Sequence, residues 1–172
     1  KEIITVCVGQ CGIRSAAGLF SLIEKEHRLE ADNDTAKAHN WTPQEGRQAR
    51  LLAIDNDSAE IDRLMMSDLG RTIPLENMIF SDIIQAATMQ KLEPNVFRRS
   101  LMHERWHSTR TLKGESPQLI QLHNSIGGGT GTAIGHAVLE YPFRLESFVC
   151  VMPYQHLSSC LIEPYDAILG WR

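Results

Sequence analysis

The apolar positions of the chain gather into short runs with polar turns and helical patterns between them. The runs of strand length are residues 3–8, 51–54, 119–122 and 147–152, with a weaker one at 77–80. A run without alternation, such as IITVCV at residues 3–8, is typical of a strand that is buried on both faces. Strands that alternate with helices at this spacing predict an α/β fold, with a mostly parallel sheet and helices on both of its faces.

Helical spacing follows several of these runs. Apolar residues recur at intervals of three and four from Ile13 to Ile23, which predicts a helix directly after the first strand. Further helical patterns cover residues 81–90, 96–110 and 130–141, and residues 157–171 are irregular or helical. Segment 30–48 is polar, contains Pro43 and Gly46, and shows no clear period. It predicts a surface loop or a partly disordered segment.

A glycine-rich stretch lies between one strand-length run and one helical pattern, at residues 119–137. Its loop holds Gly127, Gly128, Gly129 and Gly131, with Thr130 and Thr132 between them. Bare N–H groups followed by the positive end of a helix form a binding site for phosphate. The alternative interpretation is a flexible glycine turn. The loop lacks the Gly-Lys-Ser/Thr ending of a Walker loop and does not match the dinucleotide pattern GxGxxG.

The same arrangement of strand, glycine turn and helix occurs at residues 9–12, with the sequence Gly-Gln-Cys-Gly. Two such turns in one chain are more informative than either alone. Ligands of open α/β sheets bind at the carboxyl ends of the strands, where both turns are expected to lie.

Asp57 follows the strand at 51–54 and has two possible roles. With Glu60 it has the spacing of a capping box, which predicts an N-cap for the next helix. A carboxylate at this edge can also face phosphates, directly or through a bound Mg²⁺. The two roles can coexist.

Composition and charge favour one soluble domain. The chain has 172 residues, a formal net charge of −4 and a pI near 6.0, which gives no reason to expect nucleic acid as a partner. Its apolar runs are too short to span a bilayer, and no signal-peptide pattern is present, so no membrane partner is expected. The four cysteines include no C-x-x-C pair, and we expect reduced thiols in a cytoplasmic protein.

The segment His103-Glu104-Arg105-Trp106-His107 matches the zinc-hydrolase motif H-E-x-x-H. In that motif two histidines on one helix face bind the metal, and the glutamate acts as a base. Four arginines surround this copy, at residues 98, 99, 105 and 110. Their positive charge disfavours a dication, so a solvated basic helix is the default interpretation and a zinc hydrolase a remote alternative.

Taken together, the motifs resemble the tubulin superfamily in their order and spacing. The segments that carry this resemblance are 9–12 (GQCG), 55–57 (DND), 125–132 (SIGGGTGT), 151–153 (VMP) and 163–167 (EPYDA). The resemblance covers nearly the whole chain in outline, and residues 81–117 match poorly. It implies that residues 1–172 form the N-terminal nucleotide-binding part of a divergent tubulin, a Rossmann-like half of the GTPase domain.

The resemblance also implies a ligand set, GTP or GDP with Mg²⁺. Gln10 and Cys11 would lie near phosphate and base, and Asp57 would face the metal and the phosphates. Glu163 would meet the ribose hydroxyls. The residues that would cradle the phosphates are Gly128, Gly129, Thr130, Gly131 and Thr132.

The implied role is that of a structural constituent of microtubules, or of centriole and cilium structures, within the cytoplasmic cytoskeleton. Its partners would be other tubulin subunits. No catalytic residue is expected in this chain, because the family's hydrolytic acid belongs to a part beyond Arg172. Any GTPase activity would therefore depend on assembly. Lys1 in place of a methionine favours a fragment of a longer protein.

Departures from the family pattern favour an alternative. Ile13 and Arg14 replace a polar pair, and Ser159 stands where an aspartate is frequent. The loop after Phe80 lacks the Ala-Gly-Asn-Asn pattern that would contact the terminal phosphate. The alternative is a tubulin-like interaction module that has lost nucleotide exchange or nucleotide binding.

Overall fold

The structure is a computed structural model. It describes residues 3–29, 40–41, 48–80, 119–139, 145–154 and 161–171. The strands are β1 (Ile3–Val8), β2 (Leu51–Asp55), β3 (Met78–Phe80), β4 (Leu119–Ser125) and β5 (Leu145–Val151). The helices are α1 (Gly9–Leu29), α3 (Ser58–Met66), α6 (Gly129–Leu139) and α7 (Glu163–Gly170), with short 3₁₀ turns at Gly70–Thr72 and Leu75–Asn77.

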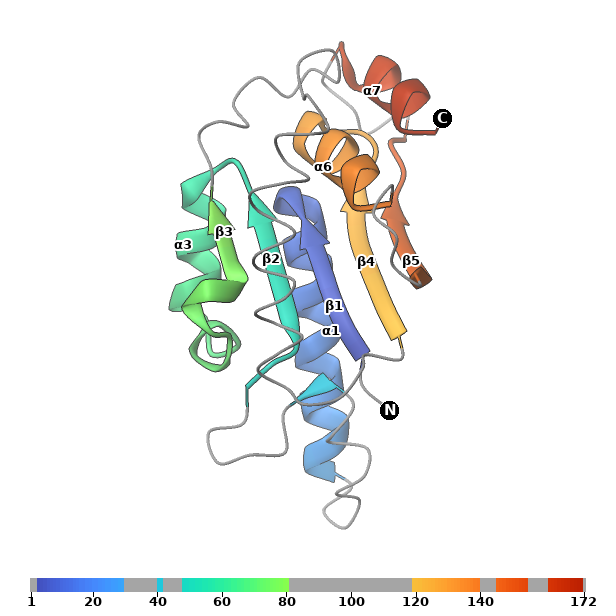
Figure 1. The fold of residues 1–172 in the computed structure, drawn as a ribbon. Helices are drawn as coiled ribbons and strands as arrows, with labels where there is room; N and C mark the ends of the chain where they lie inside the picture. The colour runs from blue at the N-terminus through green and yellow to red at the C-terminus, as the bar shows by residue number, and fades with distance from the viewer. Residues whose placement is uncertain are drawn as a thin grey trace.

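The five strands form one sheet in the order β3-β2-β1-β4-β5, and every neighbouring pair is parallel. The chain builds outward on one side of β1 and then crosses to β4 on the other side (Figure 1). This order has a switch point between β1 and β4, which is where open α/β sheets bind ligands. The predicted α/β fold is confirmed.

Helices cover both faces of the sheet, as the continuous apolar runs predict. Alternate residues of the central strands pack with Ile134 and Val138 of α6 on one face. The intervening residues pack on the other face with α1, through Ile13 and Phe20, and with Ile61 of α3. Figure 1 shows α6 in front of the sheet and α1 behind it. All five residues of β2 are buried, as expected for a strand with two covered faces.

Segment 30–48 lies mostly outside the described residues, but one of its side chains enters the core. Trp41 is 3% exposed and packs edge-on against Phe20, with ring centroids 5.5 Å apart at 72°. Residue 41 also forms an antiparallel bridge with Ala49. The polar composition of the segment gives no sign of this buried anchor.

The first glycine turn is tighter than the sequence indicates. No turn separates β1 from its helix, because α1 begins at Gly9 itself. Gly9 has a φ of 71°, the positive value that glycine adopts without strain. The helices expected at 81–90 and 96–110 lie outside the described residues.

Candidate functional site

The two glycine segments lie side by side at the switch point of the sheet. A Cβ added at Gly9 would lie 3.2 Å from the backbone nitrogen of Gly131 and 3.6 Å from the Cβ of Thr130. Helices α1 and α6 therefore begin next to each other, at the carboxyl ends of β1 and β4 (Figure 1). Their positive ends reinforce one another at this place, which favours an anion.

Ser125, the last residue of β4, shapes the loop that follows. Its hydroxyl accepts a hydrogen bond of 3.1 Å from the Gly127 N–H. The Thr132 N–H then donates to the Gly128 carbonyl at 3.0 Å, which closes the first turn of α6. Gly128 itself is exposed, and a Cβ there would meet no heavy atom of the described residues within 4 Å. Among the described residues, the loop thus leaves open space in front of the start of α6, where the N–H groups that precede Thr132 have no acceptor within the helix.

The loop after β2 joins the site through Asn56, a residue that sequence analysis did not single out. The Thr130 hydroxyl donates a 2.6 Å hydrogen bond to Asn56 Oδ1. Asp55 folds the same loop by accepting from the N–H groups of Asn56 at 2.8 Å and Asp57 at 3.2 Å. The segments 55–57 and 127–131 therefore meet, as their common place at the sheet edge predicts.

The two aspartates of this loop differ in their environment. Asp57 is exposed and caps α3, since its Oδ1 accepts from the Ala59 N–H at 2.9 Å. The predicted N-cap is confirmed. Asp55 is 2% exposed, and its Oδ2 has no hydrogen-bond partner among the described residues. Burial raises the pKa of the Asp55 carboxyl above its usual value, against the two backbone hydrogen bonds that lower it.

Glu60 does not complete the capping box that its spacing suggested. Its carboxylate turns instead to α1, where it accepts from Arg14 and from Gln10. The Gln10 side chain, expected near the phosphates, thus bonds to an acidic residue of α3 in this structure. Cys11 is half-buried, and burial raises the pKa of its thiol, while a hydrogen bond with Ser125 and the charge of Arg14 lower it.

Glu163 lies against the glycine loop although 36 residues separate it from Gly127. A Cβ added at Gly127 would lie 2.5 Å from Glu163 Oε1 and 3.1 Å from its Cγ. Glu163 is the first residue of α7. The other end of this helix packs on α6, since a Cβ at Gly170 would lie 2.7 Å from the Thr132 Cγ2. The structure thus brings Gly9, Asn56, the loop at 127–131 and Glu163 to one edge.

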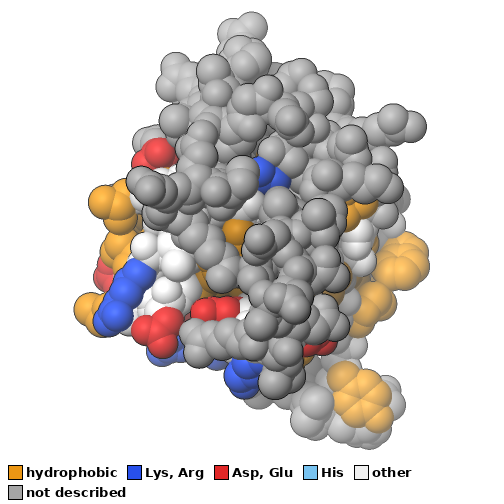
Figure 2. Space-filling model, turned by 90° about the horizontal axis from the view of Figure 1, so that it is seen from below, with side chains coloured by type: hydrophobic (Ala, Val, Ile, Leu, Met, Phe, Trp, Pro, Cys, Tyr) orange, Lys and Arg blue, Asp and Glu red, His pale blue; other side chains and the backbone are white. Residues whose placement is uncertain are grey.

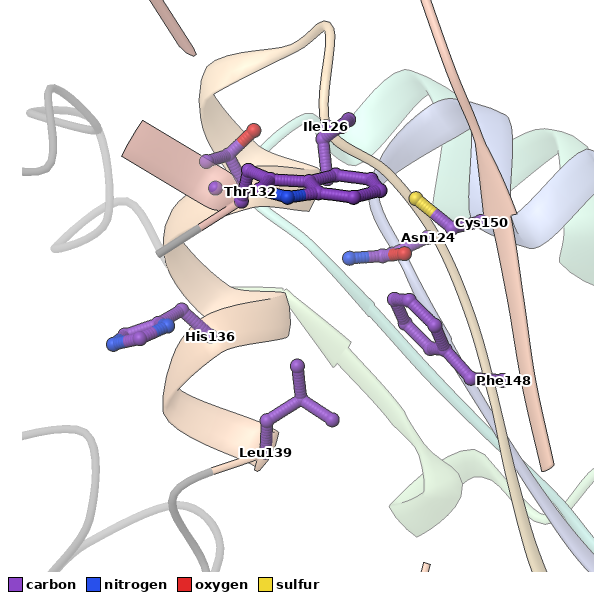
Figure 3. A pocket seen from close by; sticks show the side chains of 9 residues that line it. Asn124, Ile126, Thr132, His136, Leu139, Phe148 and Cys150 are labelled. Carbon is purple, nitrogen blue, oxygen red and sulfur yellow. The ribbon is translucent and has the colours of Figure 1, made fainter. Parts of the chain in front are cut away.

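A cavity of about 500 Å³ lies behind the loop, between α6, α7, β4 and β5. Figure 3 shows Asn124, Phe148 and Cys150 on the strand side, and Thr132, His136 and Leu139 on α6. Thr132 is 1% exposed, and its hydroxyl, like Asn124 Oδ1, is buried with no partner among the described residues. The Thr132 side chain therefore faces this cavity, and its backbone N–H belongs to the first turn of α6.

The structure describes only some of the residues that concern a zinc site or a membrane-spanning helix. The H-E-x-x-H segment, residues 103–107, lies outside the described residues. Among the residues that are described, no group of three or more His, Cys, Asp and Glu side chains is arranged to hold a metal. No helix in the described ranges is long and apolar enough to cross a membrane. On the face opposite the site, the described acidic and basic side chains are interspersed (Figure 2).

A parallel sheet with this strand order and helices on both faces defines the doubly wound α/β class of domain, in which ligands bind at the switch point. Comparison with models of protein families assigns the chain to one family within this class. The model of the Tubulin/FtsZ family GTPase domain matches residues 2–172, and the chain belongs to this family.

Curated relatives of the chain are tubulin β chains. It is 26% identical to the tubulin beta-2 chain of Geotrichum candidum over 201 residues, which cover 100% of this chain and 42% of the relative. It is 26% identical to the tubulin beta chain of Saccharomyces cerevisiae and 25% identical to the tubulin beta-1 chain of Homo sapiens, each over 99% of this chain. The chain spans 41% and 42% of the length of these two relatives.

Proposed function

We propose that this tubulin-like chain binds a guanine nucleotide, GTP or GDP, together with Mg²⁺ at the carboxyl edge of its sheet. The observation that carries the proposal is the meeting of Gly9 and Gly131 at the starts of α1 and α6. Two helix N-termini and one exposed glycine loop converge there, and each favours a phosphate.

The residues present fit such a ligand. Within the described part of the chain, the space in front of Gly128 is open, and a Cβ at that position would project into it without a contact. The loop at 128–132 would cradle the phosphates with its N–H groups and the Thr130 hydroxyl. Glu163 lies against this loop, where it would accept from the ribose hydroxyls. Cys11 and Gln10 would line the side formed by α1.

Two aspartates supply the oxygen ligands that Mg²⁺ prefers. Asp57 is exposed, and Asp55 carries a buried oxygen with no partner among the described residues. We assign the metal to Asp57 and add Asp55, which sequence analysis did not include in the site. A bound Mg²⁺ would neutralise charge on the phosphates, and the chain's own residues hold and orient the nucleotide.

The larger role follows from the family. We propose that the protein assembles with other tubulin subunits in the cytoplasmic cytoskeleton, as a constituent of microtubules or of centriole and cilium structures. We assign no catalytic residue to the chain. Hydrolysis would depend on assembly with other subunits.

A second candidate function is a tubulin-like interaction module that does not bind nucleotide. It is favoured by one observation: the Gln10 amide and the Asp57 Oδ1 are already engaged, with Glu60 and the Ala59 N–H.

Equilibrium binding of Mg·GTP and Mg·GDP separates the two candidates. The informative variant is Gly128→Leu, because its side chain would fill the open space in front of α6. Gly18→Leu is the matched control. A Cβ at Gly18 also meets no described residue within 4 Å, but it lies in the third turn of α1, away from the loop. We expect binding by wild type and Gly18→Leu and its loss in Gly128→Leu. No binding by folded wild type would support the interaction module.

A further inference from the structure

Glu60 is a buried carboxylate on which donors from two helices converge. Its side chain is 5% exposed. Arg14 forms a fork with it, donating from Nε to Oε1 at 2.9 Å and from Nη2 to Oε2 at 3.1 Å. Gln10 Nε2 donates to Oε2 at 3.2 Å, and Arg63 Nη1 at 3.4 Å. The hydrogen bond from Arg14 holds the pKa of Glu60 below its usual value, so the group is ionised.

The donors to Glu60 differ in strength. The two bonds from Arg14 are charge-assisted and bidentate, which is the strongest arrangement of this kind. Gln10 contributes one neutral donor. If the Gln10 amide leaves, Glu60 keeps both of its cationic partners and is not stranded as a buried charge. Gln10 is therefore the partner that can move with the smallest loss.

Gln10 is bonded to one acceptor, Glu60, and lies next to the loop at which we propose a second acceptor, a phosphate. Its backbone follows Gly9, which packs against Gly131 of the glycine loop, while its amide nitrogen is bonded to Glu60 on α3. A carboxylate and a phosphate both accept from an amide N–H, so a phosphate at the loop competes with Glu60 for this side chain. The same carboxylate neutralises Arg14, which is half-exposed at the edge of the site.

We propose that Glu60 is a positioning residue that holds the Gln10 amide away from the phosphate loop and thereby lowers the affinity for nucleotide. Binding transfers the amide from Glu60 to the phosphate, while Arg14 and Arg63 keep Glu60 paired. This inference rests on the proposed function, because it requires a phosphate at the loop.

The test is the dissociation constant of Mg·GDP for the wild type and for Glu60→Gln, a variant of nearly the same shape. The amide oxygen at position 60 still accepts hydrogen bonds but carries no charge, so the competing bond weakens and binding should tighten on the order of tenfold. Asp62→Asn is the matched control. It removes one negative charge from an exposed position of the same helix, and its affinity should equal that of the wild type. Equal affinity of Glu60→Gln and wild type would overturn the inference.

A double-mutant cycle with Gln10→Met isolates the part played by Gln10. In the Gln10→Met background, Glu60→Gln should bring no gain in affinity. A gain that persists would come from the unpaired arginines and would overturn the proposed competition. Because Glu60→Gln could weaken the fold, wild type provides a second readout: the side-chain N–H signals of Gln10 should shift on saturation with Mg·GDP. Signals that stay unchanged would contradict the transfer.

The outcomes also separate this inference from the proposed function. Binding by wild type that Gly128→Leu abolishes, with no effect of Glu60→Gln, overturns only the inference. Binding by neither wild type nor Glu60→Gln overturns both. Binding detected only in Glu60→Gln supports the inference and contradicts the proposed function of the wild-type chain.

Discussion

The Thr130 hydroxyl donates a 2.6 Å hydrogen bond to Asn56 Oδ1, across a separation of 74 residues in the chain. The contact joins the start of α6 to the loop after β2 and so couples the glycine loop to the pair of aspartates. It belongs to both halves of the site and exists only when β1, β2 and β4 are correctly paired.

Replacing Thr130 by valine keeps the shape of the side chain and removes its hydroxyl. We expect the free energy of unfolding to fall by about 1 kcal/mol, the usual net value of one hydrogen bond. Thr130→Ser keeps the donor and serves as the control. Urea unfolding of the three proteins measures the difference, and equal midpoints for the valine and serine variants would show that the contact is not formed in solution.

Replacement of two glycines of α1 by alanine should change the free energy of unfolding in opposite directions. A Cβ at Gly12 would overlap the backbone carbonyl of His123 on β4, whereas a Cβ at Gly18 contacts none of the residues that the structure describes. Gly12→Ala should destabilise by roughly 2 kcal/mol or more, because helix and strand must separate. Gly18→Ala should stabilise by about 0.5–1 kcal/mol through its higher helix propensity. Thermal unfolding of both variants tests the close packing of α1 on β4.

His123 predicts a pH dependence of stability. The side chain is 2% exposed, and burial lowers its pKa below the ordinary value of 6.5. Its Nδ1 lies 3.1 Å from the Ser15 hydroxyl. Below pH 6.5 the unfolded chain binds a proton that the folded chain does not, so the free energy of unfolding contributed by this group falls as the pH falls.

Comparison of wild type with His123→Asn at about pH 7.5 and about pH 5 measures this contribution, because the other titrating groups cancel in the difference. Wild type should lose more stability than the variant on acidification. An equal loss in both proteins would show that His123 is not responsible.

Cysteine reactivity should follow burial. Cys7 is fully buried in β1, its thiol contacts the Leu52 carbonyl, and burial raises its pKa strongly. Because only the thiolate reacts, we expect no alkylation of Cys7 in the folded protein and complete alkylation in denaturant. Cys11 is half-buried and should react slowly, and more slowly still with Mg·GDP. Mass spectrometry of time-quenched samples gives each rate. Alkylation of Cys7 as fast as Cys11 would contradict this packing.

The sheet could be predicted from the sequence because β1 and β2 are buried on both faces and therefore read as continuous apolar runs, as in Ile3–Val8. The glycine loop was visible for a similar reason: its backbone geometry requires residues without side chains. These are local properties, and each leaves a mark on the residues concerned.

Contacts between elements that are distant in the sequence could not be predicted from local patterns. Glu60 has the spacing of a capping box, and only the packing of α3 beside α1 shows that it pairs with Arg14. Asp57 is conspicuous by its place before a helix, while Asp55 reads as the end of a strand. Asp55 nevertheless carries a buried oxygen with no hydrogen-bond partner among the described residues. Trp41 in a polar segment and Asn56 beside Thr130 are likewise set by elements far away in the chain.

The central claim is that nucleotide binds at the switch point, on the first turn of α6. An NMR titration with Mg·GDP tests it most directly, because the backbone amide signals of individual glycines report local binding. We predict saturable shifts at Gly9, Gly128 and Gly129, with Gly18 and Gly70 unchanged. Saturable binding that leaves the signals of Gly128 and Gly129 in place would contradict the account.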